Sequence, residues 1–149
     1  RAMRLPRDDL RVTLTLDKKR LLYKLSHAFI FGALCRYASR RLAVAGVRTA
    51  ERVYGLLQSG EMTEAFLLGL LPRIRGGLVE WYCHVGLPPC RELERWTPTY
   101  RHRQEFEALT SQRVMTAVAA QGLTLTSYRE LLECSTSSSS IIRPPSTIR

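Results

Sequence analysis

One short segment of the chain combines residue types that do chemistry at enzyme sites. Residues 81–86 read Trp-Tyr-Cys-His-Val-Gly and close an apolar run at 78–83, a pattern that predicts a β-strand leading into a loop with glycine and proline. The strand would deliver His84 to the carboxyl edge of an α/β sheet or barrel, where catalytic groups gather. The alternative is that His84 merely ends a strand.

Side-chain alternation along this strand places Leu78, Glu80, Tyr82 and His84 on one face. Glu80 would then be an inward carboxylate below His84, and such a group needs a partner because burial raises the pKa of a carboxyl. Two interpretations remain open. Glu80 either supports His84 as a general acid or base, or it is the structural ion-pair partner of an arginine.

Polar residues also follow other predicted strands. Arg4, Gln58 and His84 each fall at or just after a strand end, so parallel strands would project all three from the same rim. Arg4 could hold an anionic or hydroxyl-rich ligand, and Gln58 could hydrogen-bond a sugar or an amide. Trp96 and Tyr100, beside basic residues in a long loop, suit the stacking of a sugar or a lipid headgroup, and equally the capping of a barrel end.

The elements that would position these residues alternate between strand and helix. Strands are expected at 2–5, 12–16 (or an extended arm there), 52–57, 78–83 and 123–128, and helices at 18–45, 61–71, 102–109 and 112–121, with a long loop at 87–100. This alternation predicts parallel βα units and hence an α/β fold. The serine-rich tail at 133–149 has too little apolar surface to fold and is expected to be disordered.

The stretch 18–45 is expected to be helical, with Asp17 as its N-cap and Gly46 just after its end. Its basic residues form no single stripe, so it is either two helices broken near Gly32 or one helix with an apolar middle and basic ends. Basic ends around an apolar middle could rest on an anionic bilayer. The alternative is a helical insertion that covers the side of a barrel.

The chain is strongly basic. Its 149 residues include 23 Lys and Arg against 13 Asp and Glu, for a formal net charge of +10. This balance favours anionic neighbours, which include nucleic acid, anionic lipid and phosphorylated ligands. No P-loop, dinucleotide-binding or nucleophile-elbow motif occurs, which argues against the classes of enzyme that depend on them.

The four cysteines form no C-x-x-C pair: Cys35, Cys83, Cys90 and Cys134. Their spacing suggests no disulfide framework, so a reducing compartment, the cytoplasm, is expected. A zinc site formed by Cys83, His84, Cys90 and His102 is conceivable, but the spacing matches no usual zinc finger. No secretory signal opens the sequence, and no apolar run approaches the ~20 residues of a membrane span.

Several segments resemble one protein family. Residues 78–86 resemble the T-E-hydrophobic-x-C-H-P-G segment of the YdjC-like carbohydrate deacetylases. Residues 4–7 resemble the strand and loop after that family's second metal histidine, and residues 122–131 resemble its closing strand. Residues 52–60 and 96–103 look closer to one branch, the hopanoid biosynthesis-associated deacetylases. The segments follow the order of the family.

The resemblance implies a (β/α) barrel-like fold and hydrolysis of the N-acetyl group of an acetylated amino sugar, assisted by a divalent metal (Mg²⁺ or Zn²⁺). In the hopanoid branch the implied substrate is an N-acetylglucosaminyl hopanoid lipid. The resemblance also matches His84 to a late histidine that acts near the scissile amide. The family's Asp-Asp segment and two metal histidines have no counterpart here, and Val85 stands where proline is usual.

We therefore expect residues 1–132 to be the C-terminal half of a deacetylase barrel, an α/β partial barrel with a helical insertion, inactive alone and without bound metal. The expected partners are an acetylated amino sugar or glycolipid, with peripheral contact to the inner membrane and oligomers formed through open sheet edges. The alternative is a non-catalytic module that binds sugars or lipid headgroups. A nucleic-acid-binding domain is allowed by the charge alone, but a nucleic-acid partner is not expected.

Overall fold

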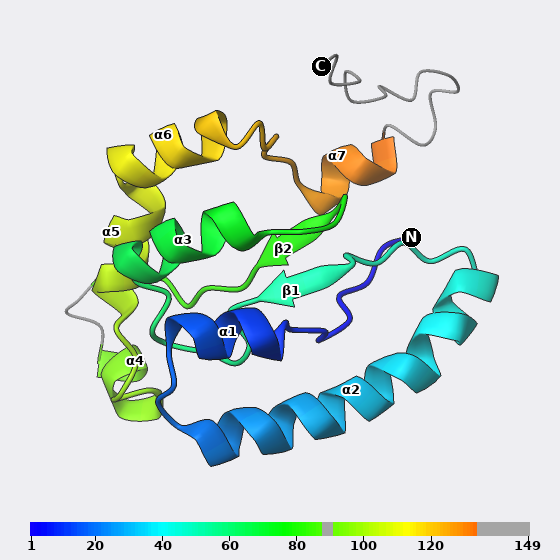
Figure 1. Cartoon of the computed structure of the whole chain (residues 1–149), viewed down its shortest axis with the longest axis horizontal. Coiled ribbons are helices and arrows are strands. Elements are labelled where there is room, and N and C mark those ends of the chain that lie inside the picture. The colour runs from blue at the N-terminus through cyan, green and yellow to red at the C-terminus, as the bar shows by residue number, and fades with distance from the viewer. Residues whose placement is uncertain (88–90, 134–149) are drawn as a thin grey trace.

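Short parallel strands lie in the middle of the fold and helices flank them (Figure 1). The computed structural model describes residues 1–87 and 91–133. In chain order the elements are α1 (Leu10–Leu16), α2 (Leu21–Val44), β1 (Arg52–Tyr54), α3 (Glu64–Leu70), the 3-10 helix η1 (Leu71–Arg73), β2 (Val79–Trp81), α4 (Arg91–Trp96), α5 (His102–Thr110), α6 (Gln112–Ala120) and α7 (Tyr128–Glu133). From residue 134 onward, the expected disordered tail lies outside the described residues.

β1 and β2 form a parallel pair, in which Val53 lies opposite Glu80. The strands expected at 52–57 and 78–83 are therefore present but shorter. Helices combined with parallel strands confirm the α/β class. A barrel-like closure is not confirmed, because the residues that the structure describes contain one two-stranded sheet.

The amino-terminal segment runs beside β1 in the same direction. Ala2 forms a parallel bridge with Arg48, and the N–H of Val53 donates a hydrogen bond to the carbonyl of Arg7 (2.9 Å). The strand expected at 2–5 is thus reduced to a bridge. Its direction still agrees with the predicted parallel arrangement, and it brings Arg4 toward the sheet.

The strand or extended arm expected at 12–16 is wrong, because these residues lie in α1. Asp9 starts the helix, since its carboxylate accepts a hydrogen bond from the N–H of Val12 (3.2 Å). Val12 and Leu16, one helical turn apart, both pack against the core. An N-cap thus decides between helix and strand where the short apolar alternation is ambiguous.

The strand expected at 123–128 is also wrong. Ser127 and Glu130 form a capping box: the Ser127 hydroxyl accepts from the N–H of Glu130 (3.3 Å), and the Glu130 carboxylate accepts from the N–H of Ser127 (2.9 Å). This box starts α7 at Tyr128 and leaves the residues before it irregular. The local capping motif outweighs the β-prone side chains that precede it.

The stretch expected at 18–45 forms one continuous helix, α2, with no break at Gly32. Its N-cap is Arg20, with a left-handed φ of 52°, rather than Asp17. Gly46 follows the helix with a φ of 64°, as expected for a residue that ends it. None of the helices within residues 1–87 and 91–133 is long and apolar enough to cross a membrane.

The remaining expected helices are confirmed with shifted ends. The helix expected at 61–71 starts later, because the Thr63 side chain caps α3 by accepting from the N–H of Phe66 (3.4 Å). α5 and α6 match the two helices expected after the loop. The loop expected at 87–100 contains an additional helix, α4.

α3 lies at the centre of the hydrophobic core and packs against α1, α5 and α6. Gly69 lets α1 come close, because a Cβ at this position would lie 2.7 Å from a methyl carbon of Leu16. The buried core residues are Tyr54, Met62, Phe66, Leu67, Leu70, Leu71, Ala108, Val114 and Val118. This core supports the end of β2, from which the candidate site projects.

Candidate functional site

Four side chains form a continuous row beyond β2: Arg4, Tyr82, His84 and Tyr100. The guanidinium of Arg4 lies over the Tyr82 ring, 4.8 Å from its centroid. The rings of Tyr82 and His84 meet edge to face at 4.6 Å, and those of His84 and Tyr100 at 4.8 Å. We name this set the aromatic row. It brings together Arg4, His84 and Tyr100, which the sequence analysis singled out separately.

Glu80 anchors one end of the aromatic row. Its carboxylate accepts hydrogen bonds from Nε of Arg4 (2.5 Å) and from the hydroxyl of Tyr128 (2.6 Å). The hydrogen bond from Arg4 to Glu80 raises the pKa of Arg4, and burial together with Glu80 raises the pKa of Tyr128 to about 12. Of the two interpretations of Glu80, the structure shows the ion pair with an arginine. Any support for His84 is indirect, through Arg4 and Tyr82.

Glu105 fixes the main chain on which His84 lies. This carboxylate is 0% exposed and accepts from two backbone N–H groups, those of Met62 (2.9 Å) and His84 (2.5 Å). It therefore ties α5 both to the turn before α3 and to the segment after β2. A carboxylate with two main-chain donors is a strong link, because charge-assisted hydrogen bonds exceed neutral ones in strength.

His102 holds His84 from the other side. Its Nδ1 lies 2.6 Å from the carbonyl oxygen of His84, which can only accept, so Nδ1 carries a proton. Its Nε2 lies 2.7 Å from Oγ1 of Thr97. Both main-chain groups of His84 are thus hydrogen-bonded within the protein, and the position of its imidazole is fixed from the backbone outward.

The His84 imidazole is partly buried between the two tyrosines. Burial lowers the pKa of His84 below its ordinary value, and the Glu105 carboxylate opposes this shift. Its Nδ1 is buried and makes no hydrogen bond to any residue that the structure describes. The ring is therefore neutral at neutral pH and carries a lone pair that can accept a proton.

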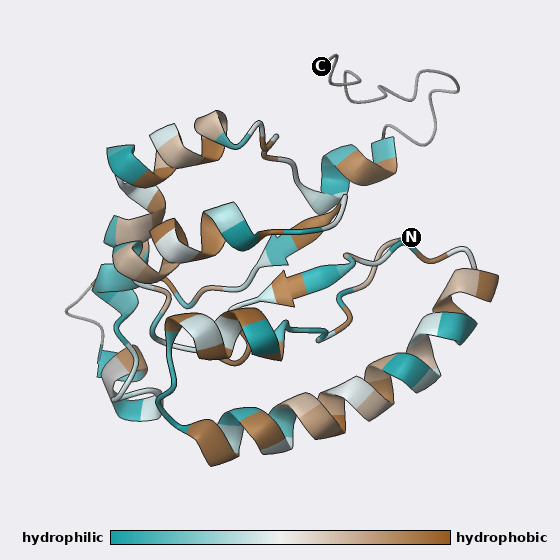
Figure 2. Cartoon of the chain, in the orientation of Figure 1, coloured by the Kyte–Doolittle hydropathy of each residue, from teal (hydrophilic) through white to brown (hydrophobic). Residues whose placement is uncertain are grey.

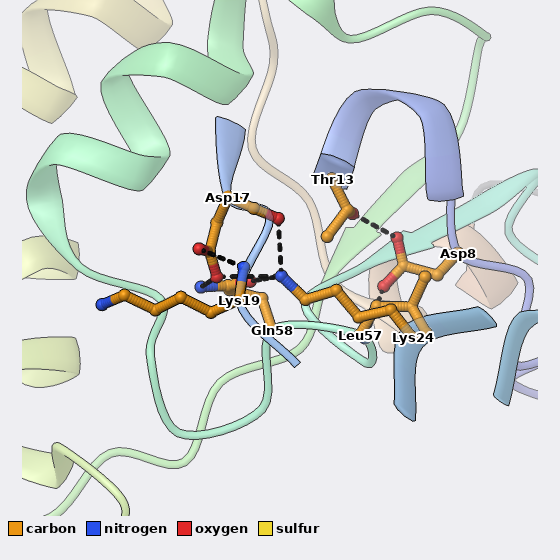
Figure 3. A network of polar contacts seen from close by, with 7 residues as sticks. All are labelled: Asp8, Thr13, Asp17, Lys19, Lys24, Leu57 and Gln58. Carbon is orange, nitrogen blue, oxygen red and sulfur yellow. Dashed lines mark hydrogen bonds and ion pairs between the residues drawn. The ribbon is translucent and has the colours of Figure 1, made fainter. Parts of the chain in front are cut away.

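Two expected substrate-binding residues lie apart from the aromatic row. Gln58 is buried in a polar network (Figure 3), where its Oε1 accepts from Nζ of Lys24 (2.9 Å) and its Nε2 donates to Asp17 (3.0 Å). The expected shared rim therefore does not include Gln58. Trp96 is 75% exposed at the end of α4, with the Arg95 guanidinium 5.3 Å from its ring centroid. Sugar binding by Trp96 stays a prediction.

The sequence also matches the model of a protein family. This model, described as YdjC-like protein, matches residues 1–120, most of the chain. The chain belongs to the YdjC-like family. The family is related to carbohydrate deacetylases, which supports a general deacetylase function. No curated protein and no solved structure matches the chain.

Three contributors to the site of this YdjC-like protein were not selected from the sequence: Tyr82, Glu105 and Tyr128. Tyr82 could have been, because alternation places it on the face of Glu80 and His84. Glu105 gave a weaker signal, as a carboxylate on the buried side of the amphipathic helix α5. Tyr128 gave none, because it meets Glu80 across 48 positions of sequence.

The described residues of the YdjC-like chain contain no group of three or more His, Cys, Asp and Glu side chains that could hold a metal ion. Of the cysteines considered for a zinc site, Cys83 is free and Cys90 lies outside the described residues. Burial raises the pKa of Cys83 to about 12, which disfavours the thiolate that binds metals. The described residues therefore do not fit the divalent metal that the resemblance implies.

Proposed function

We propose that this chain provides the substrate-binding and proton-transfer side of a carbohydrate deacetylase that hydrolyses the N-acetyl group of an acetylated amino sugar. Membership of the YdjC-like family supports the deacetylase chemistry. The observation that carries the proposal is the aromatic row, in which an imidazole with a lowered pKa lies between two tyrosine rings at the end of a parallel strand.

Amide hydrolysis needs a group that takes a proton from the attacking water and a group that gives one to the leaving amine. His84 suits the first task, because its lowered pKa keeps the ring able to accept a proton at neutral pH. Tyr100 offers a flat apolar surface for the C–H face of a pyranose. Arg4, partly exposed beyond Tyr82, has guanidinium donors for sugar hydroxyls.

The resemblance also implies Mg²⁺ or Zn²⁺, which would polarise the amide carbonyl when bound. Because the described residues do not form a site for such an ion, no step is assigned to it. The proposal concerns only what the aromatic row and its supports contribute. The resemblance implies that the family's metal ligands lie in a segment that has no counterpart in this sequence.

The finer proposal for the substrate is an N-acetylglucosaminyl hopanoid lipid, used at the cytoplasmic face of the inner membrane. Its support is the resemblance of residues 52–60 and 96–103 to the hopanoid-associated branch. Both segments meet at the site, because the N–H of Arg101 donates to the carbonyl of Gly60 (2.8 Å). The Tyr100 ring covers Gly60 so closely that a Cβ there would lie 2.4 Å from it.

Binding of a methyl glycoside of N-acetylglucosamine, followed by saturation-transfer NMR, tests the proposed site. We expect the acetyl methyl and the ring protons to receive magnetisation from the protein, and glucosamine to bind more weakly. Tyr100→Ala and His84→Ala should each weaken binding about tenfold, because an aromatic contact is lost. The ordinary pKa of a histidine is ~6.5, and burial lowers the pKa of His84 below it. The ring therefore stays neutral at that pH, and sugar binding should weaken only at a lower pH, when the ring takes up a proton.

The matched control is Tyr37→Ala, which removes an exposed ring from α2, outside the aromatic row. It should leave the sugar signals unchanged. Equal binding of acetylated and deacetylated sugar would contradict a deacetylase site. Binding that His84→Ala does not alter would instead favour the non-catalytic sugar or headgroup module.

Acetate release gives a separate test. We expect none from the 149-residue chain with an N-acetylglucosaminyl substrate and added Mg²⁺ or Zn²⁺. The reason is that the described residues offer no cluster of metal ligands, although the resemblance requires one. An enzyme-coupled acetate assay with a metal titration measures this. Metal-dependent turnover would show that the expectation about the missing ligands is wrong.

A further inference from the structure

The outer face of α2 carries large apolar side chains although it faces solvent, and Arg36 and Arg40 lie among them. Leu22, Phe29 and Val44 are 83%, 80% and 92% exposed. At about 3.6 residues per turn, these three and Tyr37 fall on the side of the helix opposite the buried Lys24 and Cys35. Figure 2 shows hydrophobic and hydrophilic residues mixed along the length of α2. The outward side of a surface helix is normally polar, so this face calls for a partner.

The inner face of α2 is already occupied by the protein. Phe31 and His27 line a small cavity together with Pro6 and Leu57, and Cys35 is buried further along the helix. With respect to residues 1–87 and 91–133, the outer face is the one left open to another surface. Because it runs along the whole helix, the partner must lie lengthwise against α2.

The charge around this face has one sign. Between residues 18 and 50 the sequence contains eight Lys and Arg and no Asp or Glu: Lys18, Lys19, Arg20, Lys24, Arg36, Arg40, Arg41 and Arg48. Lys24 is buried and paired with Asp17. Lys18, Lys19 and Arg20 precede the first turn of α2, and Arg36 and Arg40 lie on the outer face between Phe29 and Val44. The guanidinium of Arg41 lies over the Tyr37 ring, 4.6 Å from its centroid.

We infer that α2 is a membrane-docking helix, which lies along an anionic lipid surface with Leu22, Phe29, Tyr37 and Val44 in the interfacial layer. Apolar and aromatic side chains can enter the interfacial layer while the long arginine side chains among them extend to the lipid phosphates. Arg36, Arg40 and Arg41 would contact the lipid phosphates. The opposite face keeps its contacts with the rest of the protein.

The distribution of charge on α2 distinguishes an anionic bilayer from two other partners, a second copy of the chain and a nucleic acid. Both ends of α2 are basic, so pairing of α2 with a second copy, parallel or antiparallel, would place cations against cations. A nucleic acid would satisfy the cations through its phosphates but leave Leu22, Phe29 and Val44 in water. An anionic bilayer satisfies both the cations and the apolar side chains.

Vesicle flotation of the whole chain tests the inference. We expect the protein to float with vesicles of phosphatidylcholine that contain about one-third phosphatidylglycerol, and to stay behind with phosphatidylcholine alone. Raising the salt from about 0.05 M to about 0.5 M should weaken the partition, because the surface charges are screened.

Charge variants distinguish the contribution of the α2 cations to membrane binding from that of the overall positive charge of the chain. Replacement of Arg36, Arg40 and Arg41 by Glu should lower the partition coefficient on the order of a hundredfold. The reason is that each cation near the surface contributes a factor of about five or more, and three such factors multiply. The matched control makes the same change of charge at three exposed arginines outside α2: Arg91, Arg101 and Arg129. The control should retain most of the binding.

Apolar variants test the other half of the surface. Phe29→Ser and Val44→Ser should each weaken the partition about tenfold, since each removes a large apolar side chain from the interface. Leu125→Ser, at an exposed apolar position outside α2, should have no effect. Circular dichroism confirms that each variant is folded, and all substituted side chains are exposed in the native state.

Three results would overturn the inference. One is a folded protein that does not float with anionic vesicles. Another is flotation that the α2 variants and the controls alter equally. The third is a dimer in sedimentation analysis, or binding to duplex DNA, that depends on Phe29 and Val44 while flotation is absent.

Discussion

Replacement of Asp17 by alanine should lower the free energy of unfolding by about 3–5 kcal/mol, because it removes the charged partner of a buried ammonium, that of Lys24. Lys24 is 2% exposed, and its ammonium donates to the Asp17 carboxylate (2.8 Å), the Asp17 carbonyl (2.8 Å) and Gln58 (2.9 Å). Without the carboxylate the ammonium stays buried with neutral acceptors. Urea unfolding followed by circular dichroism measures the change.

Replacement of the other partner, Lys24, should lower the free energy of unfolding much less. Lys24→Met keeps the apolar stem of the side chain, and the Asp17 carboxylate still accepts from the N–H of Lys19 (3.0 Å) and from Gln58 (3.0 Å). Burial raises the pKa of Asp17, but its hydrogen bonds and the charge of Lys24 outweigh burial and hold the pKa at about 2. The double variant should be more stable than the sum of both losses implies. A cost of Lys24→Met equal to that of Asp17→Ala would contradict this account.

Replacement of Glu105 by leucine should destabilise the protein by about 2–6 kcal/mol. The change leaves the N–H groups of Met62 and His84 buried without an acceptor, at about 1–3 kcal/mol each. It should also loosen the loop that carries His84, so that sugar binding weakens in parallel. Urea unfolding and sugar titration of the same variant measure both effects.

Glu107→Leu is the matched control for this prediction. Glu107 lies on the same helix but pairs with Arg103 in an exposed i,i+4 contact. Its loss should change the free energy of unfolding by no more than about 0.5 kcal/mol. If both substitutions cost the same, the buried carboxylate does not have the structural role assigned to it.

Sequence reasoning succeeded where local rules act strongly. Long helices could be located from periodicity and from a glycine such as Gly46 after the end, and strand alternation correctly placed Glu80, Tyr82 and His84 on one side. It failed where a cap competes with β-prone residues, at 12–16 and at 123–128. Both caps are visible in the sequence, so these errors come from weighting alternation above capping.

The positions of site residues in space were less predictable. Gln58 follows a strand, as expected of a rim residue, but Lys24, 34 positions away, draws its amide into a structural network. Tyr100 joins His84 only because Gly60 leaves room for its ring. Such contacts depend on tertiary packing, which periodicity and motif spacing do not contain.

The anchor at Glu80 has a consequence for the order in which the protein matures. Its carboxylate joins Arg4 across 76 positions and Tyr128 across 48. A contact that closes such a large loop forms only when the two residues that close it are both free to meet. During synthesis on the ribosome, Arg4 and Glu80 emerge before Tyr128, so the ion pair can form first and the anchor is completed only after Tyr128 has emerged.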